Sequence, residues 1–253
     1  MSKFLIKQAF AEAMDLHKKN RFNEAKEIYN KILTLDESEP NAHHLISLIF
    51  MAEGNFDQSK EHIEKAIHKA PEQPVFLSNY GSLLHSMGNL QASVNALKKS
   101  IKIDKKNFQS YYSLGIVYTD MSEYEKATEN YLKALEINNQ SAEAHNNLAN
   151  LFSSLNNTEA EYHYKKTVEL VPNKIYPRLN MANYYIKNGQ FDKSLSPLTE
   201  LIDIGLESKE VFNSLGVAYK GVDNEKEAKK MFEKALVIDS TFDLAKKNLD
   251  SIE

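Results

Sequence analysis

Histidine and serine are among the side chains of this 253-residue chain that could carry acid–base or nucleophilic chemistry. The eight histidines include no pair four residues apart, so the helical spacing of a zinc protease is missing. Ser82 and His85 could share one helix face, but no third group orients the histidine and no oxyanion element is apparent. Cysteine is absent, and so is a phosphate-binding glycine loop. We therefore expect no enzymatic activity, no metal site and no cofactor.

Asparagine is a second residue type whose side chain could bind a ligand, and it occupies 24 of the 253 positions. An amide side chain has two N–H donors and a carbonyl acceptor, so it can bond both the N–H and the C=O groups of an extended peptide. Binding of this kind needs several amides along one surface. Whether they share a surface depends on the elements that carry them.

Those elements follow from a repeat that runs through most of the chain. A small residue returns every 33 or 34 positions, at Ala25, Ser59, Ser93, Ala127, Ala160, Ser194 and Ala228. Four residues after each one stands a large apolar residue: Tyr29, Ile63, Leu97, Tyr131, Tyr164, Leu198 and Phe232. A spacing of four places both residues on one helix face, so each repeat brings a small and a bulky side chain together. The period predicts an array of one structural unit used seven times.

Each unit reads as a helical hairpin. Its first half has apolar residues at positions four, seven, eight and eleven, the pattern of an amphipathic helix. A short polar turn separates this half from a second helix in every unit. The predicted turns are Asn20-Arg21, Gly54-Asn55, Gly88-Asn89, Ser122-Glu123, Asn156-Asn157, Gly189-Gln190 and Asp223-Asn224. The seven units are expected at residues 6–39, 40–73, 74–107, 108–141, 142–174, 175–208 and 209–242. Residues 243–253 repeat the first-helix pattern and are expected to cap the array.

This pattern resembles the tetratricopeptide repeat (TPR) family, which has small residues at positions eight, twenty and twenty-seven and aromatics at eleven and twenty-four. The fourth unit shows it best, with Tyr111, Leu114, Gly115, Tyr118, Tyr124, Ala127, Tyr131 and Ala134 in register. The resemblance implies an all-α fold, a right-handed α-solenoid of helix hairpins.

Two units depart from the pattern. The fifth is one residue short in its turn, and the sixth carries Pro197 inside its second helix. Because proline lacks a backbone N–H, we expect this helix either to begin late, at Ser196, or to be kinked. We interpret the sixth unit as a hinge.

The resemblance also implies which residues face a partner. In the family the first helices line a concave groove, here positions two, five, six, nine and thirteen of each unit. We call these positions the first-helix stripe. Eight of its 35 residues are asparagine. We expect peptide binding by Asn79, Ser82, Tyr112, Ser113, Asn146, Asn147, Asn150, Asn180, Asn183 and Asn213.

The asparagines at position six, Asn79, Asn147 and Asn180, partly resemble the amide ladder in the TPR region of O-linked N-acetylglucosamine transferase. Ala11, Leu45, Ser113 and Ser214 interrupt the ladder at the same position in other units. The alternative is that the asparagines are only solvated polar residues.

The net charge of −4 provides no basic surface for nucleic acid, and no apolar run is long enough for a membrane span. The N-terminal residues do not form a signal peptide, so a cytoplasmic location is expected. The sequence therefore predicts a non-catalytic scaffold that binds a protein or an extended peptide. The alternative is a substrate-recruiting region of a larger glycosyltransferase or sulfotransferase system, and self-association is possible.

Overall fold

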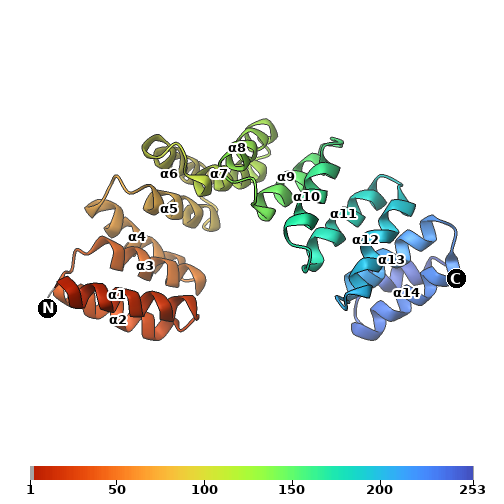
Figure 1. Ribbon diagram of the computed structural model, residues 1–253, viewed down its shortest axis with the longest axis horizontal. Helices are drawn as coiled ribbons and strands as arrows, with labels where there is room; N and C mark the ends of the chain where they lie inside the picture. Colours follow the sequence, from red (N-terminus) through yellow and green to blue (C-terminus); the bar gives the residue numbers. More distant parts are fainter. Residues whose placement is uncertain (1–2, 253) are drawn as a thin grey trace. The chain divides into compact units, whose positions relative to one another are not determined.

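The computed structural model describes residues 3–252, which form fifteen helices and no strand. The chain divides into two compact units, residues 1–139 and 140–253. Unit 1 contains α1 (Lys3–Lys18), α2 (Phe22–Leu35), α3 (Pro40–Ala52), α4 (Phe56–Lys69), α5 (Pro74–Ser86), α6 (Leu90–Ile103), α7 (Phe108–Asp120) and α8 (Tyr124–Ile137). Unit 2 contains α9 (Ala142–Ser154), α10 (Ala160–Leu170), α11 (Ile175–Lys187), α12 (Phe191–Asp203), α13 (Lys209–Gly221), α14 (Glu225–Ile238) and α15 (Asp243–Asp250). Within each unit the hairpins stack one on the next (Figure 1).

Six of the seven first helices begin at the residue where the sequence places a new repeat. Pro40 and Pro74 occupy the first turn of α3 and α5, where a missing N–H costs nothing. Ser141 caps α9, because its Oγ accepts the N–H of Ala144 at 3.1 Å. The residues that favour a helix start therefore agree with the 33- or 34-residue period of the repeat. The exception is α1, which begins at Lys3.

The turns inside the hairpins share one backbone conformation. The first residue of each predicted turn has a positive φ, between 56° and 78°: Asn20, Gly54, Gly88, Ser122, Asn156, Gly189 and Asp223. The N–H that follows it donates to the carbonyl five residues earlier at 2.8–2.9 Å, as from Asn55 to Phe50. This left-handed closure satisfies carbonyls that the end of the first helix leaves unpaired. Ser122 and Asp223 adopt it although neither is a glycine or asparagine.

Small residues set how closely the two helices of a hairpin approach. Ala25, Ala127 and Ala228 are fully buried, as are Tyr29 and Phe232, which follow two of them. Glycine at the eighth position of a first helix faces the bulky residue of the second. A Cβ added at Gly115 would lie 2.5 Å from the ring of Tyr131, and one at Gly81 would lie 2.5 Å from Leu97. Such contacts leave no room for a larger residue.

The path of α12 corrects one expectation. This helix begins at Phe191 and continues through Pro197 to Asp203, so the late start predicted at Ser196 is wrong. Pro197 is buried, and its neighbours Leu198 and Leu201 are fully buried. Burial of this apolar face holds the helix together although the proline donates no hydrogen bond. A kink at Pro197 stays a prediction.

Successive first helices contact each other within each unit. In unit 1, α5 contacts both α3 and α7; in unit 2, α11 contacts α9 and α13, and α13 contacts α15. No comparable contact joins successive second helices in the range 3–252. First helices therefore lie on the inner side of the stack in each unit. The first-helix stripe is exposed at some positions, such as Asn150 and Asn183, and buried at others, such as Ser113. At the end of unit 2, α15 packs on α14 and buries Ala245, and its role as a cap of the array stays a prediction.

Candidate functional site

Four of the ten predicted binding residues lie in unit 1, on α5 and α7. The Nδ2 of Asn79 donates to Nε2 of His44 at 2.7 Å. Burial lowers the pKa of His44 to about 4, so its imidazole is neutral and can accept this bond. Ser82 and Ser113 lie 3.3 Å apart, oxygen to oxygen, and link α5 to α7. Tyr112 stacks on Phe108 with ring centroids 5.8 Å apart.

The other six lie in unit 2, where amides link successive first helices. Asn180 Nδ2 donates to Asn146 Oδ1 at 2.8 Å, and the Ser214 hydroxyl donates to Asn183 Oδ1 at 2.9 Å. Asn248 Nδ2 of the capping helix donates to Asn213 Oδ1 at 2.9 Å. Asn147 is half-buried on α9, and Asn150 is exposed. The stripe is therefore also a ladder of bonds that couples one repeat to the next.

Three of these residues surround a hollow that we call the amide pocket. It has a volume of about 180 Å³ and lies in unit 2, where α9, α10 and α11 meet. Its lining residues are Asn150, Ser153, Tyr164, Asn180, Asn183, Tyr184 and Lys187. No carboxylate lines it. The pocket brings together three amides, two tyrosines and one positive charge.

Hydrogen bonds within the protein fix what the amides offer to a ligand. The Tyr164 hydroxyl donates to Asn150 Oδ1 at 2.7 Å, and burial raises the pKa of Tyr164 to about 12, so it stays a donor. With both Oδ1 atoms engaged, Asn150 and Asn183 keep their amino groups for a ligand. Asn180 uses its amino group on Asn146 and keeps its carbonyl oxygen. The pocket thus presents donors and an acceptor side by side.

The sequence prediction missed part of this pocket. Lys187 is a stripe residue whose ammonium donates to the carbonyl of Ser153. Tyr164 belongs to the second helix α10, and the ring of Tyr184 lies against it at a tilt of 45°, with ring centroids 5.5 Å apart. The large-residue series marks Tyr164 as a core position. No sequence signal shows that its hydroxyl reaches the groove.

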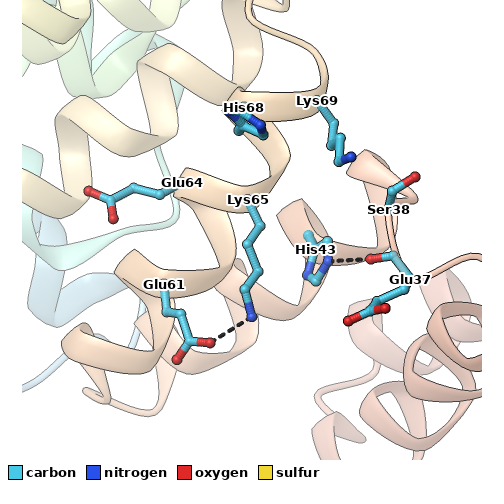
Figure 2. A pocket seen from close by; sticks show the side chains of 8 residues that line it. All are labelled: Glu37, Ser38, His43, Glu61, Glu64, Lys65, His68 and Lys69. Atoms are coloured by element: carbon cyan, nitrogen blue, oxygen red, sulfur yellow. Dashed lines mark hydrogen bonds and ion pairs between the residues drawn. The ribbon is translucent and has the colours of Figure 1, made fainter.

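A larger hollow, of about 560 Å³, lies in unit 1 beside α4 and the turn before α3. Figure 2 shows that its charged groups are partly engaged with one another. Lys65 pairs with Glu61 at 2.6 Å, and His43 Nε2 donates to the Glu37 carbonyl at 2.9 Å. The Tyr80 hydroxyl donates to Glu64 at 2.6 Å. None of the ten predicted binding residues lines it.

Two pairs of histidines join first and second helices. His43 and His62 face each other with 3.0 Å between their Nδ1 atoms, and His145 and His163 with 2.8 Å. The other ring nitrogen of His43, Nε2, donates to the Glu37 carbonyl. His43 and His145 both occupy position four of their units, on the apolar face of the first helix, and both are buried. Within residues 3–252, no cluster of three or more histidine or acidic residues could hold a metal ion, and no helix is long and apolar enough to cross a membrane.

The stacked hairpins define an all-α helical repeat solenoid, as predicted. Two family profiles match the chain, one described as TPR repeat at residues 81–122 and 117–156. The other, described as Tetratricopeptide repeat, matches residues 13–39, 40–68 and 210–242. Together they cover well over half of the chain. The chain belongs to the tetratricopeptide repeat family, which confirms the resemblance seen in the sequence.

Curated relatives are longer than this chain. TPR repeat-containing protein MJ1428 of Methanocaldococcus jannaschii is 26% identical over 170 residues, which are 64% of this chain and 29% of the relative. BBSome complex member BBS4 of Bos taurus is 22% identical over 60% of this chain and 29% of its own length. The chain therefore spans less than a third of either relative.

Solved structures show the same fold. The C-terminal part of a TPR repeat-containing protein from Cytophaga hutchinsonii is 18% identical and superposes with a TM-score of 0.70, covering 95% of this chain and 99% of that one. YrrB, described as a TPR protein with an unusual peptide-binding site, is 24% identical with a TM-score of 0.62. That match covers 73% of this chain and 96% of YrrB.

Proposed function

We propose that this chain is a non-catalytic protein-interaction scaffold that binds an extended segment of a partner protein along its first-helix stripe. The amide pocket of unit 2 is the principal contact. The observation that carries this proposal is the pairing of free amide donors on Asn150 and Asn183 with a free acceptor on Asn180. A peptide backbone has the complementary groups, so the pocket can bind it with little dependence on side chains.

Lys187 adds selectivity to this contact. Its ammonium has three protons, and one hydrogen bond is made to Ser153. The remaining donors carry a positive charge into a pocket without carboxylates. Partner carbonyl oxygens and acidic side chains are favoured there over basic ones.

The comparisons support a scaffold of this kind. One curated relative is by name a member of a protein complex, and one solved neighbour is described as having a peptide-binding site. We extend both uses to this chain as part of the proposal. The ten residues predicted from the sequence are the proposed contact set.

We expect the triple variant Asn150→Ala, Asn180→Ala, Asn183→Ala to lose at least about tenfold in partner affinity. Each lost hydrogen bond contributes about 0.5–1.5 kcal/mol, so three exceed the 1.4 kcal/mol of a tenfold change. Partners are captured from lysate on wild type and variant, and the affinity of each captured partner is then measured by titration. The matched control is Asn23→Ala, Asn30→Ala, Asn95→Ala, three exposed asparagines on second helices.

Ser214→Ala provides a second control. It removes the inter-repeat bond to Asn183 while leaving the Asn183 amide in the pocket. A binding loss in the triple variant that Ser214→Ala does not share assigns the effect to the pocket. Equal affinity of the triple variant and wild type would contradict the proposed function.

A further inference from the structure

Helix α6 is charged differently from the other second helices of the hairpins. Among the described residues it is the one second helix without a carboxylate. It contributes three exposed lysines, and two more follow in the turn before α7. We call these five the basic patch: Lys98, Lys99, Lys102, Lys105 and Lys106. With Asp104 they give residues 90–107 a net charge of +4, whereas the whole chain has −4, so the rest of the chain carries −8.

The basic patch has no neutralising partner in the part of the chain that the structure describes. None of its five ammonium groups forms an ion pair or a hydrogen bond there, although Lys98 lies over the ring of Tyr118 at 5.8 Å. Each of the other six second helices contributes to at least one ion pair. The helices packed against α6 are α5 and α7, and their one carboxylate, Asp120, pairs with His85 at 2.6 Å.

The helix itself does not account for these lysines. Lys98 and Lys102 are four residues apart and Lys99 and Lys102 are three apart, so like charges repel one another across one helix face. Attraction to the negative end of the helix dipole is confined to the last turn, where Lys102 is the one basic residue of α6. All five side chains are exposed, so the packing of the repeats does not need them. A surface of this kind attracts a negatively charged partner.

We infer that the basic patch docks an acidic segment of a partner protein, on a helix that contributes nothing to the first-helix stripe. Lys98 and Lys102 are separated by about 6 Å along the helix axis. Carboxylates on every second residue of an extended segment are separated by about 6.6 Å, so alternate acidic residues can meet successive lysines. Ile103 is 40% exposed between the lysines of α6 and those of the turn, and it offers an apolar contact to the same segment.

The charge distribution favours a short acidic protein segment over a nucleic acid or a membrane. DNA and anionic bilayers present negative surfaces that extend well beyond the basic patch. The net charge of −8 on the rest of the chain repels such a surface. A short acidic segment can lie within the patch and avoid this repulsion.

The test uses a displayed library of random twelve-residue peptides selected on the full chain at low ionic strength. We expect peptides with three or more acidic residues that lose tenfold or more in affinity for the triple variant Lys99→Glu, Lys102→Glu, Lys106→Glu. The matched control makes the same charge change at exposed positions of α14, with Lys226→Glu, Lys230→Glu, Lys234→Glu. Affinity for this control and for the amide-pocket triple variant should change less than twofold, which separates this inference from the proposed function.

Arginine at the same three positions of the basic patch gives a second readout because it keeps the positive charge. The arginine variant should bind the selected peptides within threefold of wild type, and added salt should weaken the binding of both. A library without acidic peptides sensitive to the glutamate variant would overturn the inference, as would lost binding in the arginine variant or binding that salt does not weaken. Tighter binding of single-stranded DNA or of phosphatidylserine vesicles, abolished by the glutamate variant, would assign the patch to a nucleic acid or a membrane and equally overturn it.

Discussion

Replacing Phe232 with alanine is expected to lower the free energy of unfolding by about 3–5 kcal/mol. Phe232 is fully buried on α14 and is the bulky member of the last small–large pair. Its removal leaves a cavity that rigid neighbouring helices can fill only in part. Urea denaturation followed by circular dichroism measures the change. Val237→Ala on the same helix is the control, because Val237 is 86% exposed and should change stability by less than about 0.5 kcal/mol.

A double-mutant cycle tests whether Gly216 and Phe232 pack against each other. Gly216 faces Phe232, and a Cβ at Gly216 would overlap the phenylalanine ring. Alanine normally stabilises a helix by about 1 kcal/mol relative to glycine, but here overpacking should reverse the sign and cost about 1–3 kcal/mol. When Phe232 is replaced by leucine, Gly216→Ala should become less harmful by about 1 kcal/mol or more. Strictly additive effects would show that the two residues are not packed against each other.

Acidification should destabilise the protein through three buried or half-buried histidines. Burial lowers the pKa of His44, His62 and His163 to about 4, against an ordinary value of 6.5. The folded state therefore binds fewer protons than the unfolded state below pH 6.5. Stability from these groups is fully present above pH 6.5 and is lost as the pH falls from 6.5 to about 4. For His163, which is 6% exposed, the loss amounts to about 3 kcal/mol.

Replacing His163 with glutamine isolates this contribution. Glutamine keeps hydrogen-bonding capacity but does not titrate, so the decline in the free energy of unfolding between pH 7 and pH 4 should be smaller than in wild type by about 3 kcal/mol. His68→Gln, at an exposed position of α4, should leave the wild-type profile unchanged. Parallel profiles for His163→Gln and wild type would show that His163 does not determine the acid stability of the protein.

The fold could be predicted from the sequence because the repeat period, the helix-start residues and the turn residues all indicate the same helix boundaries. Period, helix starts and turn residues all place new helices at Pro40, Pro74 and Phe108, and the helices begin there. The turn residues predicted which backbone positions have a left-handed conformation, even where Ser122 or Asp223 replaces glycine. The register of the repeat determines these features, so no tertiary contact needs to be known in advance.

What the sequence could not reveal depends on packing across repeats. The period runs through residue 139 without interruption, yet the chain divides there into two compact units. The path of α12 through Pro197 depends on the burial of Leu198 and Leu201, which outweighs the local effect of proline. Local propensity alone favoured a break, so the prediction of a late start failed.

The same limit applies to the candidate site. The stripe positions identified Asn150, Asn180 and Asn183, which the structure brings into one pocket. Their hydrogen bonds to Tyr164, Asn146 and Ser214 decide which amide atoms remain for a ligand, and those partners come from other helices.

Photo-crosslinking at one stripe position tests the central claim, that partners bind along the first helices, most directly. A benzoyl-phenylalanine placed at Asn183, which is exposed on α11, should form abundant adducts with partner proteins in source cells. The same group at Tyr162, 57% exposed on the second helix α10, should form few. Equal adducts at both positions, or adducts at Tyr162 alone, would contradict binding along the first-helix stripe.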